Sequence, residues 1–441
     1  MKAYIPSGPE DRQTMLDRLG LQDVMALFQD VPEDLLVQDL AVPDGMSEMD
    51  LYRHMSDLSK KNHVFTDLWR GAGAYRHYIP AVVRSIMAKE RFITSYTPYQ
   101  AEISQGILQS IFEYQTSICE LTGMDVSNAS LYDGGSALAE ACRMAIGRKK
   151  NEVLLLGNIH PQVIEVVQSY HYGDDVKISL VEAGSDGLID WAKVEEALTD
   201  QTAAICFQQP NFLGLIEDAP TLIAKAKEKK LKTIVQVNPA TLGVLEAPGK
   251  LGADIAVGEG QSLGLPLSFG GPYVGFLACK EDLKRQLPGR IVGQTVDAEG
   301  RRAFVLTLQA REQHIRREKA SSNVCSNQAL CAMQVNAYLA AMGPDGLRKQ
   351  GLWSAHNAQA LAGVLGALGF ELLDEKPFFH EFRTSSPVNA YKLEKYLAKK
   401  DILMGLPLAE DEILWCATEL NDQAARSEEP KRIQKYLEEK R

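Results

Sequence analysis

Short apolar runs alternate with amphipathic segments along most of the chain. Seven of these runs are predicted as strands, at 128–131, 153–156, 176–181, 203–207, 233–237, 254–257 and 273–278. Nearly continuous apolar strands separated by helices are typical of a parallel sheet that is covered on both faces. We therefore predict an α/β fold with a mostly parallel, seven-stranded sheet.

The chain divides into three predicted domains around this sheet. Residues 1–65 are predicted as an N-terminal helical arm, because short apolar repeats are broken there by prolines. Residues 66–330 form the large α/β domain. A long helical stretch from about 327 to 369, interrupted at Gly343-Pro344, leads into a small C-terminal α+β domain at 331–441.

One helix start is predicted from its capping residues. Thr97-Pro98-Tyr99-Gln100 has the form of a capping box, with a hydroxyl N-cap, Pro at the first helical position and Gln at the third. Apolar residues recur after it at intervals of three and four, and Gly123 supplies the stop. The pattern predicts a helix from about residue 98 to residue 122.

Composition and charge narrow the function. Hydrophobic residues make up 45% and charged residues 24% of the 441 residues, as in ordinary globular enzymes, which excludes a disordered chain. The net charge of −11 disfavours nucleic acid and anionic membrane surfaces as partners. No apolar run approaches the roughly 18 to 20 residues that span a bilayer, and the N-terminus lacks a signal-peptide core. We expect a cytoplasmic protein that acts on a small molecule or another protein.

The loops after the predicted strands carry the first candidate residues, because ligands of open α/β sheets bind beyond the carboxyl ends of the strands. Asp133, Gly134 and Gly135 precede a helix, where backbone N–H groups can cradle a phosphate or carboxylate, although such glycines are more often only a tight turn. His160 and Asn238 also follow strands. Their alternative roles are the start of a helix and the start of a turn before Pro.

The segment 308–323 is the most polar stretch without an evident structural role. It holds Arg311, His314, Arg316 and Arg317, and guanidinium groups can bind carboxylates through paired hydrogen bonds. The alternative is a solvated basic helix face that pairs with its own glutamates.

Several blocks closely resemble one family. They are Tyr96–Gly106, Asn128–Asp133, Pro288–Gly293, Arg311–Arg317 and Lys319-Ala320. From about residue 46 onward the chain resembles glycine decarboxylase, the P-protein of the glycine cleavage system. It is most similar to the first subunit of the two-gene form, which corresponds to the N-terminal half of the one-chain form.

The resemblance implies the aspartate-aminotransferase-like fold of pyridoxal phosphate enzymes. In that fold a Lys after one strand binds the cofactor covalently, and an Asp one strand earlier pairs with its pyridine nitrogen. Here Asn238 stands near the expected Asp, and Gly258–Gly264 stands where the Lys loop is expected. That loop contains Gln261 and Ser262 but no Lys, and Lys250 precedes the strand instead of following it.

The resemblance resolves this departure by implying a second, Lys-bearing P-protein subunit in an α2β2 heterotetramer. In the family reaction, glycine is decarboxylated on the partner's pyridoxal phosphate and the aminomethyl group passes to the lipoyl group of the H-protein. The residues expected to complete the partner's site or the interface are Tyr96, Thr97, Tyr99, Gln100, Arg311, His314 and Arg316. The expected vestigial cofactor pocket comprises Asp133, Gly134, Gly135, His160, Asn238, Gln261 and Ser262.

Two other functions stay open at this point. The chain could be a non-catalytic structural or regulatory mate of a pyridoxal phosphate enzyme. It could also be an autonomous enzyme that uses an unexpected Lys. The resemblance favours neither of these two. It favours a subunit of glycine decarboxylase that is inactive without its partner.

Overall fold

The computed structural model describes residues 7–37, 39–93, 96–147, 149–421 and 425–440. The chain separates into two units, residues 1–64 and residues 65–441. The first unit contains α1 (Pro9–Leu19), α2 (Glu48–Ser59) and two 3₁₀ turns, η1 (Val24–Phe28) and η2 (Glu33–Leu35). Leu16 is the only described residue of this unit that is buried.

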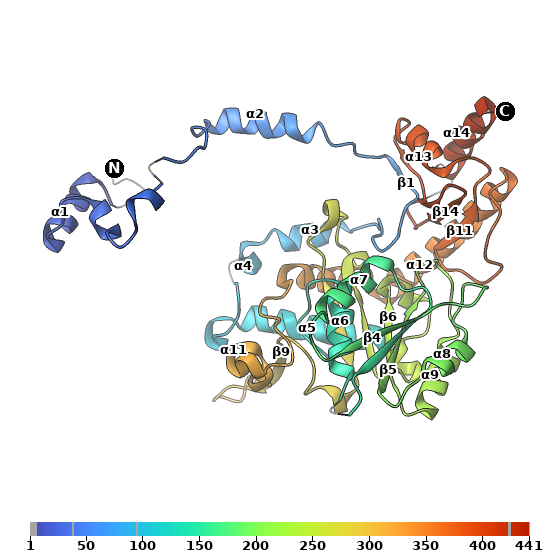
Figure 1. Cartoon of the computed structure of the whole chain (residues 1–441), viewed down its shortest axis with the longest axis horizontal. Helices are drawn as coiled ribbons and strands as arrows, with labels where there is room; N and C mark the ends of the chain where they lie inside the picture. Colours follow the sequence, from blue (N-terminus) through green and yellow to red (C-terminus); the bar gives the residue numbers. More distant parts are fainter. Residues whose placement is uncertain (1–6, 38, 94–95, 148, 422–424, 441) are drawn as a thin grey trace. The chain divides into compact units, whose positions relative to one another are not determined.

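A seven-stranded sheet forms the centre of the second unit (Figure 1). Its order is β2-β8-β7-β6-β5-β3-β4, with β3 to β7 parallel and β2 and β8 antiparallel to their neighbours. The strands are β2 (Val126–Ser127), β3 (Glu152–Leu156), β4 (Lys177–Val181), β5 (Thr202–Gln209), β6 (Lys232–Val237), β7 (Ile255–Glu259) and β8 (Gly275–Cys279). The predicted mostly parallel, seven-stranded sheet is confirmed.

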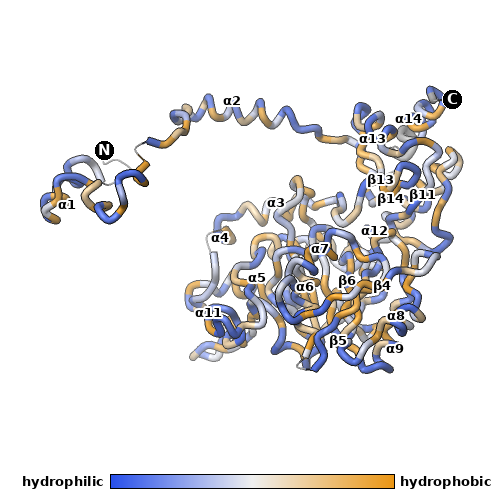
Figure 2. The backbone as a smooth tube through the Cα atoms, in the orientation of Figure 1, coloured by the Kyte–Doolittle hydropathy of each residue, from blue (hydrophilic) through white to orange (hydrophobic). Residues whose placement is uncertain are grey.

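Helices cover both faces of this sheet. One hydrophobic cluster joins the sheet to α5 (Gln105–Thr122), α8 (Trp191–Ala197), α9 (Ala219–Glu228) and α12 (Ala329–Ala367). A second cluster joins the opposite face to α6 (Gly134–Ala145) and α7 (Pro161–Tyr170). Alternate residues of one strand serve the two faces: Ile205 lies in the first cluster and Cys206 in the second. Figure 2 accordingly shows β5 and β6 in largely hydrophobic colours.

The last part of the chain has its own sheet and core. Strands β11 (Glu381–Ser385), β14 (Glu412–Cys416) and β13 (Leu406–Ala409) form an antiparallel sheet. Helices α13 (Ala390–Ala398) and α14 (Ala425–Lys440) belong to this part, and one core cluster joins its residues to those of α12. Helix α12 has a non-helical residue at Gly343, as the Gly343-Pro344 pair predicts. The domain boundary at residue 330 stays a prediction.

Shorter elements complete the second unit. They are β1 (Asp67–Leu68), which pairs with β12 (Ile402–Leu403), the β9 (Ile291–Val296) and β10 (Arg302–Thr307) hairpin, α3 (Ala81–Met87), α4 (Glu90–Ile93), α10 (Pro248–Leu251) and α11 (Gln313–Arg316). None of the described helices has both the length and the apolar character needed to cross a membrane.

Two local predictions are wrong. Helix α5 begins at Gln105 and not after Thr97, because 96–100 are non-helical and Ala101–Ile103 form the separate 3₁₀ turn η3. Its predicted end is right, since Gly123 takes the left-handed conformation with φ of 69°. The predicted strand at 128–131 is also displaced: β2 ends at Ser127, and only Leu131 forms an isolated bridge, to Gly275.

Candidate functional site

A cavity of about 400 Å³ lies at the carboxyl ends of β5, β6 and β7, between the loop 72–75 and the starts of α6 and α7. All seven residues of the expected vestigial pocket line it. They come together from four loops that are distant in the sequence, as the parallel sheet predicts. We call it the sheet-end pocket. Its other lining residues include Tyr75, Gln208, Gln236 and Glu259.

The start of α6 forms one wall of the sheet-end pocket. Asp133 is its N-cap, and Asp133 Oδ1 accepts a 2.7 Å hydrogen bond from the Ser136 N–H. Gly134 lies so close to β7 that a Cβ atom there would stand 2.9 Å from Glu259 Cβ and from the Glu259 backbone nitrogen. Gly134 therefore serves the close packing of α6 on β7, and the expected role of these glycines as an anion cradle stays a prediction.

Glu259 is a pocket residue that the sequence analysis missed. It ends β7, and its carboxylate accepts hydrogen bonds from the backbone N–H groups of Gly134 at 3.0 Å, Gln261 at 3.0 Å and Val274 at 3.1 Å. Burial raises its pKa to about 7 against the lowering effect of these hydrogen bonds. An acid between two glycines at the end of an apolar strand is the signal that could have found it.

Gln261 holds the wall of the pocket. Its Oε1 accepts from the Tyr75 N–H at 2.8 Å, and its Nε2 donates to the carbonyl oxygens of Tyr75 and Leu265, each at 2.9 Å. Every described hydrogen bond of this side chain is thus internal, and only 1% of the residue is exposed. Gln261 ties the loop 72–75 to the sheet.

Asn238 and Ser262 face each other across the end of β6. The Ser262 hydroxyl donates to Asn238 Oδ1 at 2.7 Å, and Oδ1 also accepts from the Ala240 N–H. Asn238 therefore does start a turn, the 3₁₀ helix η4 (Pro239–Gly243). Within the described residues, the buried Asn238 Nδ2 and Gln236 Oε1 have no hydrogen-bond partner, so two of the residues that line the pocket each carry an unpaired polar atom.

His160 takes the helix-start role considered for it and also lines the pocket. It is the N-cap of α7, where Nδ1 accepts from the Gln162 N–H, and its Nε2 lies 2.9 Å from the Ala72 carbonyl oxygen. This arrangement places the proton on Nε2. Burial lowers the pKa of His160, so the ring is neutral at pH 7.

These residues do not fit a covalently bound pyridoxal phosphate. The loop that follows β7 offers the side chains of Gln261 and Ser262 in place of an amine. Asn238 Oδ1 already accepts from Ser262 and Ala240, whereas a protonated pyridine nitrogen needs a free acceptor. The start of α6, where a phosphate would bind, already carries a carboxylate.

A second group of predicted residues meets elsewhere. Arg290 donates to the Tyr99 hydroxyl at 3.0 Å and its guanidinium stands 5.3 Å from the centre of the Tyr99 ring. The Tyr99 ring meets His314 edge to face at 5.6 Å, and the Tyr96 hydroxyl lies 2.8 Å from Ser326 Oγ. We call Tyr96, Tyr99, Arg290, His314 and Ser326 the tyrosine cluster. The structure joins the two predicted segments, 96–100 and 311–317.

Buried charge lies behind the tyrosine cluster. Arg290 is only 5% exposed, and it also donates to Asn327 Oδ1. Arg311 donates to the Leu287 carbonyl oxygen, and its Nε and second terminal nitrogen have no partner among the described residues. Glu312 is buried beside these cations, and burial raises its pKa. Arg311 is therefore not part of a solvated helix face.

A larger cavity of about 850 Å³ opens beside this cluster, against α6 and α7. Its wall includes Tyr99, Glu140, Glu312, His314 and Arg317. Three predicted residues stand apart. Thr97 is half-buried with its carbonyl oxygen bonded to the Tyr99 N–H, while Gln100 and Arg316 are exposed and line neither cavity.

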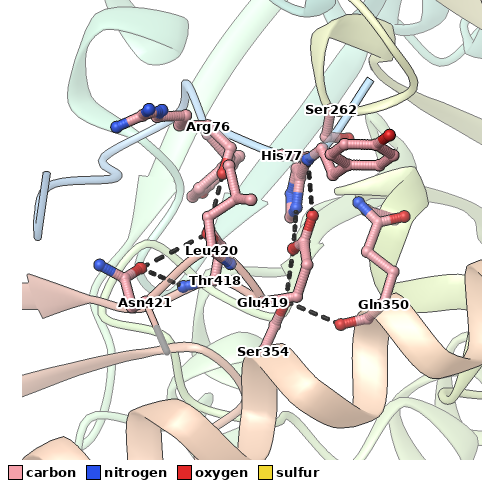
Figure 3. Close-up of polar contacts among 12 residues, drawn as sticks. Arg76, His77, Ser262, Gln350, Ser354, Thr418, Glu419, Leu420 and Asn421 are labelled. Carbon is pink, nitrogen blue, oxygen red and sulfur yellow. Dashed lines mark hydrogen bonds and ion pairs between the residues drawn. The ribbon is translucent and has the colours of Figure 1, made fainter. Parts of the chain in front are cut away.

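The loop that walls the sheet-end pocket is also anchored to the C-terminal part of the chain. Glu419 Oε2 lies 2.7 Å from His77 Nδ1, and Oε1 accepts from the Tyr78 N–H at 2.7 Å. Figure 3 shows Glu419 between His77 and Ser354, with Thr418 bonded to the Arg76 carbonyl oxygen. These contacts fix the segment from which Tyr75 reaches the pocket.

Comparison with known proteins identifies relatives along nearly the whole chain. The model of the glycine cleavage system P-protein family matches residues 2–425. The chain is 48% identical over 427 residues to the probable glycine dehydrogenase (decarboxylating) subunit 1 of Desulforamulus reducens, covering 94% of this chain and 96% of that protein. It is also 48% identical over 407 residues to the protein of the same name from Carboxydothermus hydrogenoformans, covering 91% of each.

Solved structures agree with these relatives. A crystal structure of glycine decarboxylase (P-protein) of the glycine cleavage system, in inhibitor-bound form, matches with a TM-score of 0.91 and 38% identity over 98% of this chain and 99% of that chain. An aspartate aminotransferase from Thermus thermophilus matches with a TM-score of 0.59 and 16% identity over 85% of this chain and 99% of that chain, which confirms the predicted aspartate-aminotransferase-like fold alone. From the family match, the high identity and the shared architecture, the chain belongs to the P-protein family of the glycine cleavage system.

Proposed function

We propose that this chain is the Lys-lacking subunit of a two-subunit glycine decarboxylase. In the assembled enzyme, glycine loses its carboxylate on pyridoxal phosphate that the second subunit binds covalently. The aminomethyl group then passes to the lipoyl group of the H-protein. The cofactor supplies the electron sink for decarboxylation. This chain completes the site or its interface and is inactive alone.

The observation that best supports this proposal is the position and hydrogen bonding of Gln261. This residue stands in the loop where the family resemblance implies the cofactor lysine, and its side chain makes three hydrogen bonds to the chain's own backbone. A fully bonded, buried amide has no nucleophile to offer an aldehyde. The name "subunit 1" of the relatives supports a second P-protein subunit as the partner.

The tyrosine cluster is the part of this chain that we propose to border the partner's pocket. Tyr96 is 85% exposed and Tyr99 is 49% exposed, and Arg290, the partner of Tyr99, is buried and also bonded to Asn327. Aromatic side chains with a polar tip are well suited to an interface, because one end packs and the other donates or accepts. The half-buried Thr97 and the exposed Gln100 belong to the same segment and are included in the proposed interface.

The arginines are proposed to order this surface electrostatically and not to grip the leaving carboxylate. A tight clamp on that carboxylate would stabilise bound glycine and oppose loss of carbon dioxide. Arg290 is already committed to Tyr99 and Asn327, and Arg311 to the Leu287 carbonyl oxygen. His314 and the exposed Arg316 are the remaining members of the proposed interface set.

We expect the complex to be an α2β2 heterotetramer in the cytoplasm, with lipoylated H-protein as a transient partner. The second candidate function is a purely structural or regulatory mate. Its support is that the polar tips of Tyr96 and Tyr99 are both bonded within this chain. The two functions differ in whether substitutions at these residues slow the assembled enzyme without disrupting it.

The proposal is tested by titrating pyridoxal phosphate into the purified chain, its candidate partner and the mixture, followed by borohydride reduction, which fixes the cofactor on the lysine that holds it. We expect this chain to stay colourless on its own. In the mixture, we expect the label on the partner and none on this chain. Label on a specific lysine of this chain, such as Lys250, would replace the proposal with an autonomous enzyme. A mixture without glycine-dependent release of carbon dioxide would reject the decarboxylase assignment.

A further inference from the structure

Glu259 is positioned where an anionic ligand would otherwise bind. The start of an α-helix carries a partial positive charge and N–H groups without partners in the helix, so it attracts phosphate or carboxylate groups. At the start of α6, the Gly134 N–H donates to Glu259 Oε2 and the Ser136 N–H donates to Asp133 Oδ1. Two of the first three donors of this helix are thus satisfied by carboxylates of the chain itself.

The close packing of α6 on β7 holds the Glu259 carboxylate at the start of α6. The absent Cβ of Gly134 lets the Glu259 backbone approach to a distance that any other side chain would prevent. Glu259 Oε1 is held at the same time by the Gln261 and Val274 N–H groups, one from the loop after β7 and one from the segment before β8. The Glu259 side chain is therefore fixed in the wall of the pocket, and it could leave this position only by breaking three hydrogen bonds.

The other walls add no positive charge. Among the described residues that line the sheet-end pocket, none is Lys or Arg, and two, Asp133 and Glu259, are carboxylic acids. His160 is neutral, and the unused polar atoms of Asn238 and Gln236 are amide groups. A phosphate monoester brings between one and two negative charges at pH 7, and the pocket offers it no side-chain cation.

We infer that Glu259 is a built-in anion that occupies the α6 start in place of a phosphate group, so that this chain's own pocket rejects phosphorylated and sulfated ligands. The lack of a lysine removes covalent attachment, and Glu259 removes the non-covalent anchor as well. The inference concerns this chain alone and stands whether or not the proposed function is correct.

The test uses sulfate as the probe, because it stays doubly charged between pH 6 and pH 8. Calorimetric titrations at constant ionic strength compare the full wild-type chain with Glu259→Gln. The control is Glu246→Gln, which removes the same charge from an exposed side chain. At pH 8 we expect Glu259→Gln to bind sulfate about tenfold more tightly than the wild type, and the control to match the wild type. Equal affinities of wild type and Glu259→Gln would overturn the inference.

A second measurement keeps the inference testable if Glu259→Gln does not fold. The pKa of Glu259 is about 7, so wild-type affinity for sulfate should rise by up to about tenfold from pH 8 to pH 6 as the carboxylate is protonated. The groups that face Glu259 are Asp133, Tyr114, Tyr273 and Cys331. The last three have raised pKa values and stay neutral throughout this range. A flat profile for the wild type would overturn the inference.

Discussion

The Tyr75 hydroxyl donates a 2.8 Å hydrogen bond to Glu381 Oε2, and the Ala72 N–H donates to Oε1 of the same carboxyl at 2.6 Å. Glu381 is the first residue of β11 and is 4% exposed. The loop that walls the sheet-end pocket is therefore bound to the C-terminal sheet through one buried acid. Burial raises the pKa of Glu381 to about 7, against the lowering effect of these two hydrogen bonds.

This raised pKa predicts a stability that falls as pH rises. Between about pH 4.5, the ordinary pKa of a Glu side chain, and about pH 7, the folded chain keeps a proton on Glu381 that the unfolded chain has lost. The stabilisation is complete below about pH 4.5 and is lost as pH rises through about 7. At about 1.4 kcal/mol per pKa unit, the shift from 4.5 to about 7 amounts to at most about 3.5 kcal/mol.

Glu381→Gln should remove this pH dependence. We expect its melting temperature to fall less between pH 5.5 and pH 8.5 than that of the wild type, and to exceed the wild-type value at pH 8.5. Thermal melts at several pH values measure this, with Glu246→Gln as the exposed control. Parallel pH profiles for wild type and Glu381→Gln would show that Glu381 does not titrate as argued.

The tyrosine cluster predicts unequal effects of two matched substitutions. Tyr99→Phe leaves a buried guanidinium N–H of Arg290 without an acceptor, at a cost of about 1 to 3 kcal/mol. Tyr96→Phe breaks a solvent-exposed bond to Ser326 and should leave the melting temperature nearly unchanged. Under the proposed function, both variants should lower glycine-dependent carbon dioxide release in the assembled complex without preventing assembly.

The control for both is Tyr172→Phe, since Tyr172 is 91% exposed and lies outside the cluster. Unchanged kinetics for Tyr96→Phe and Tyr99→Phe, with assembly intact, would exclude these side chains from the reaction. The structural or regulatory mate would then be the better description.

The sheet could be predicted from the sequence because burial on both faces gives each central strand a nearly continuous run of apolar residues. The start of α5 could not be. Tyr99 has a capping-box context, but its side chain is engaged by Arg290, which lies 191 positions away, and no local pattern reports such a contact. Distant contacts of this kind override local helix signals.

The candidate pocket shows the same division. Loops at the ends of parallel strands are predictable meeting points, and all seven pocket residues do line one cavity. Glu259 was missed because its contact with Gly134 spans 125 positions and depends on the close packing of α6 on β7. Gly134 was recognised as a candidate, whereas Glu259, which packs against it, was not.

That packing predicts opposite effects of two Gly→Ala substitutions. Gly134→Ala puts a Cβ 2.9 Å from Glu259 atoms, including backbone, and should destabilise the fold by about 1 to 3 kcal/mol. Gly106→Ala, within α5, meets no atom within 4 Å and should stabilise by up to about 1 kcal/mol through helix propensity. Thermal melts of both variants decide the matter, and a Gly134→Ala chain as stable as the wild type would contradict the close approach.

The Glu419 contacts predict a second, opposite pH response. Burial alone would raise the pKa of Glu419, but the hydrogen bond and charge of His77 outweigh burial and lower it. The stabilisation by this carboxylate is therefore present above its ordinary pKa of 4.5 and is lost as pH falls through the lower folded value.

Glu419→Gln should cost about 1 to 3 kcal/mol at pH 7 and progressively less toward pH 4. The control is Ser354→Ala, which removes a 3.3 Å contact with the same carboxylate and a 2.8 Å hydrogen bond to the Gln350 carbonyl oxygen but leaves the carboxylate charge in place, and it should cost less. Hydrogen exchange at residues 72–78 should also quicken in Glu419→Gln, because this carboxylate anchors the segment that walls the pocket. Unchanged exchange together with an unchanged melting temperature would show that the segment is held by its other contacts.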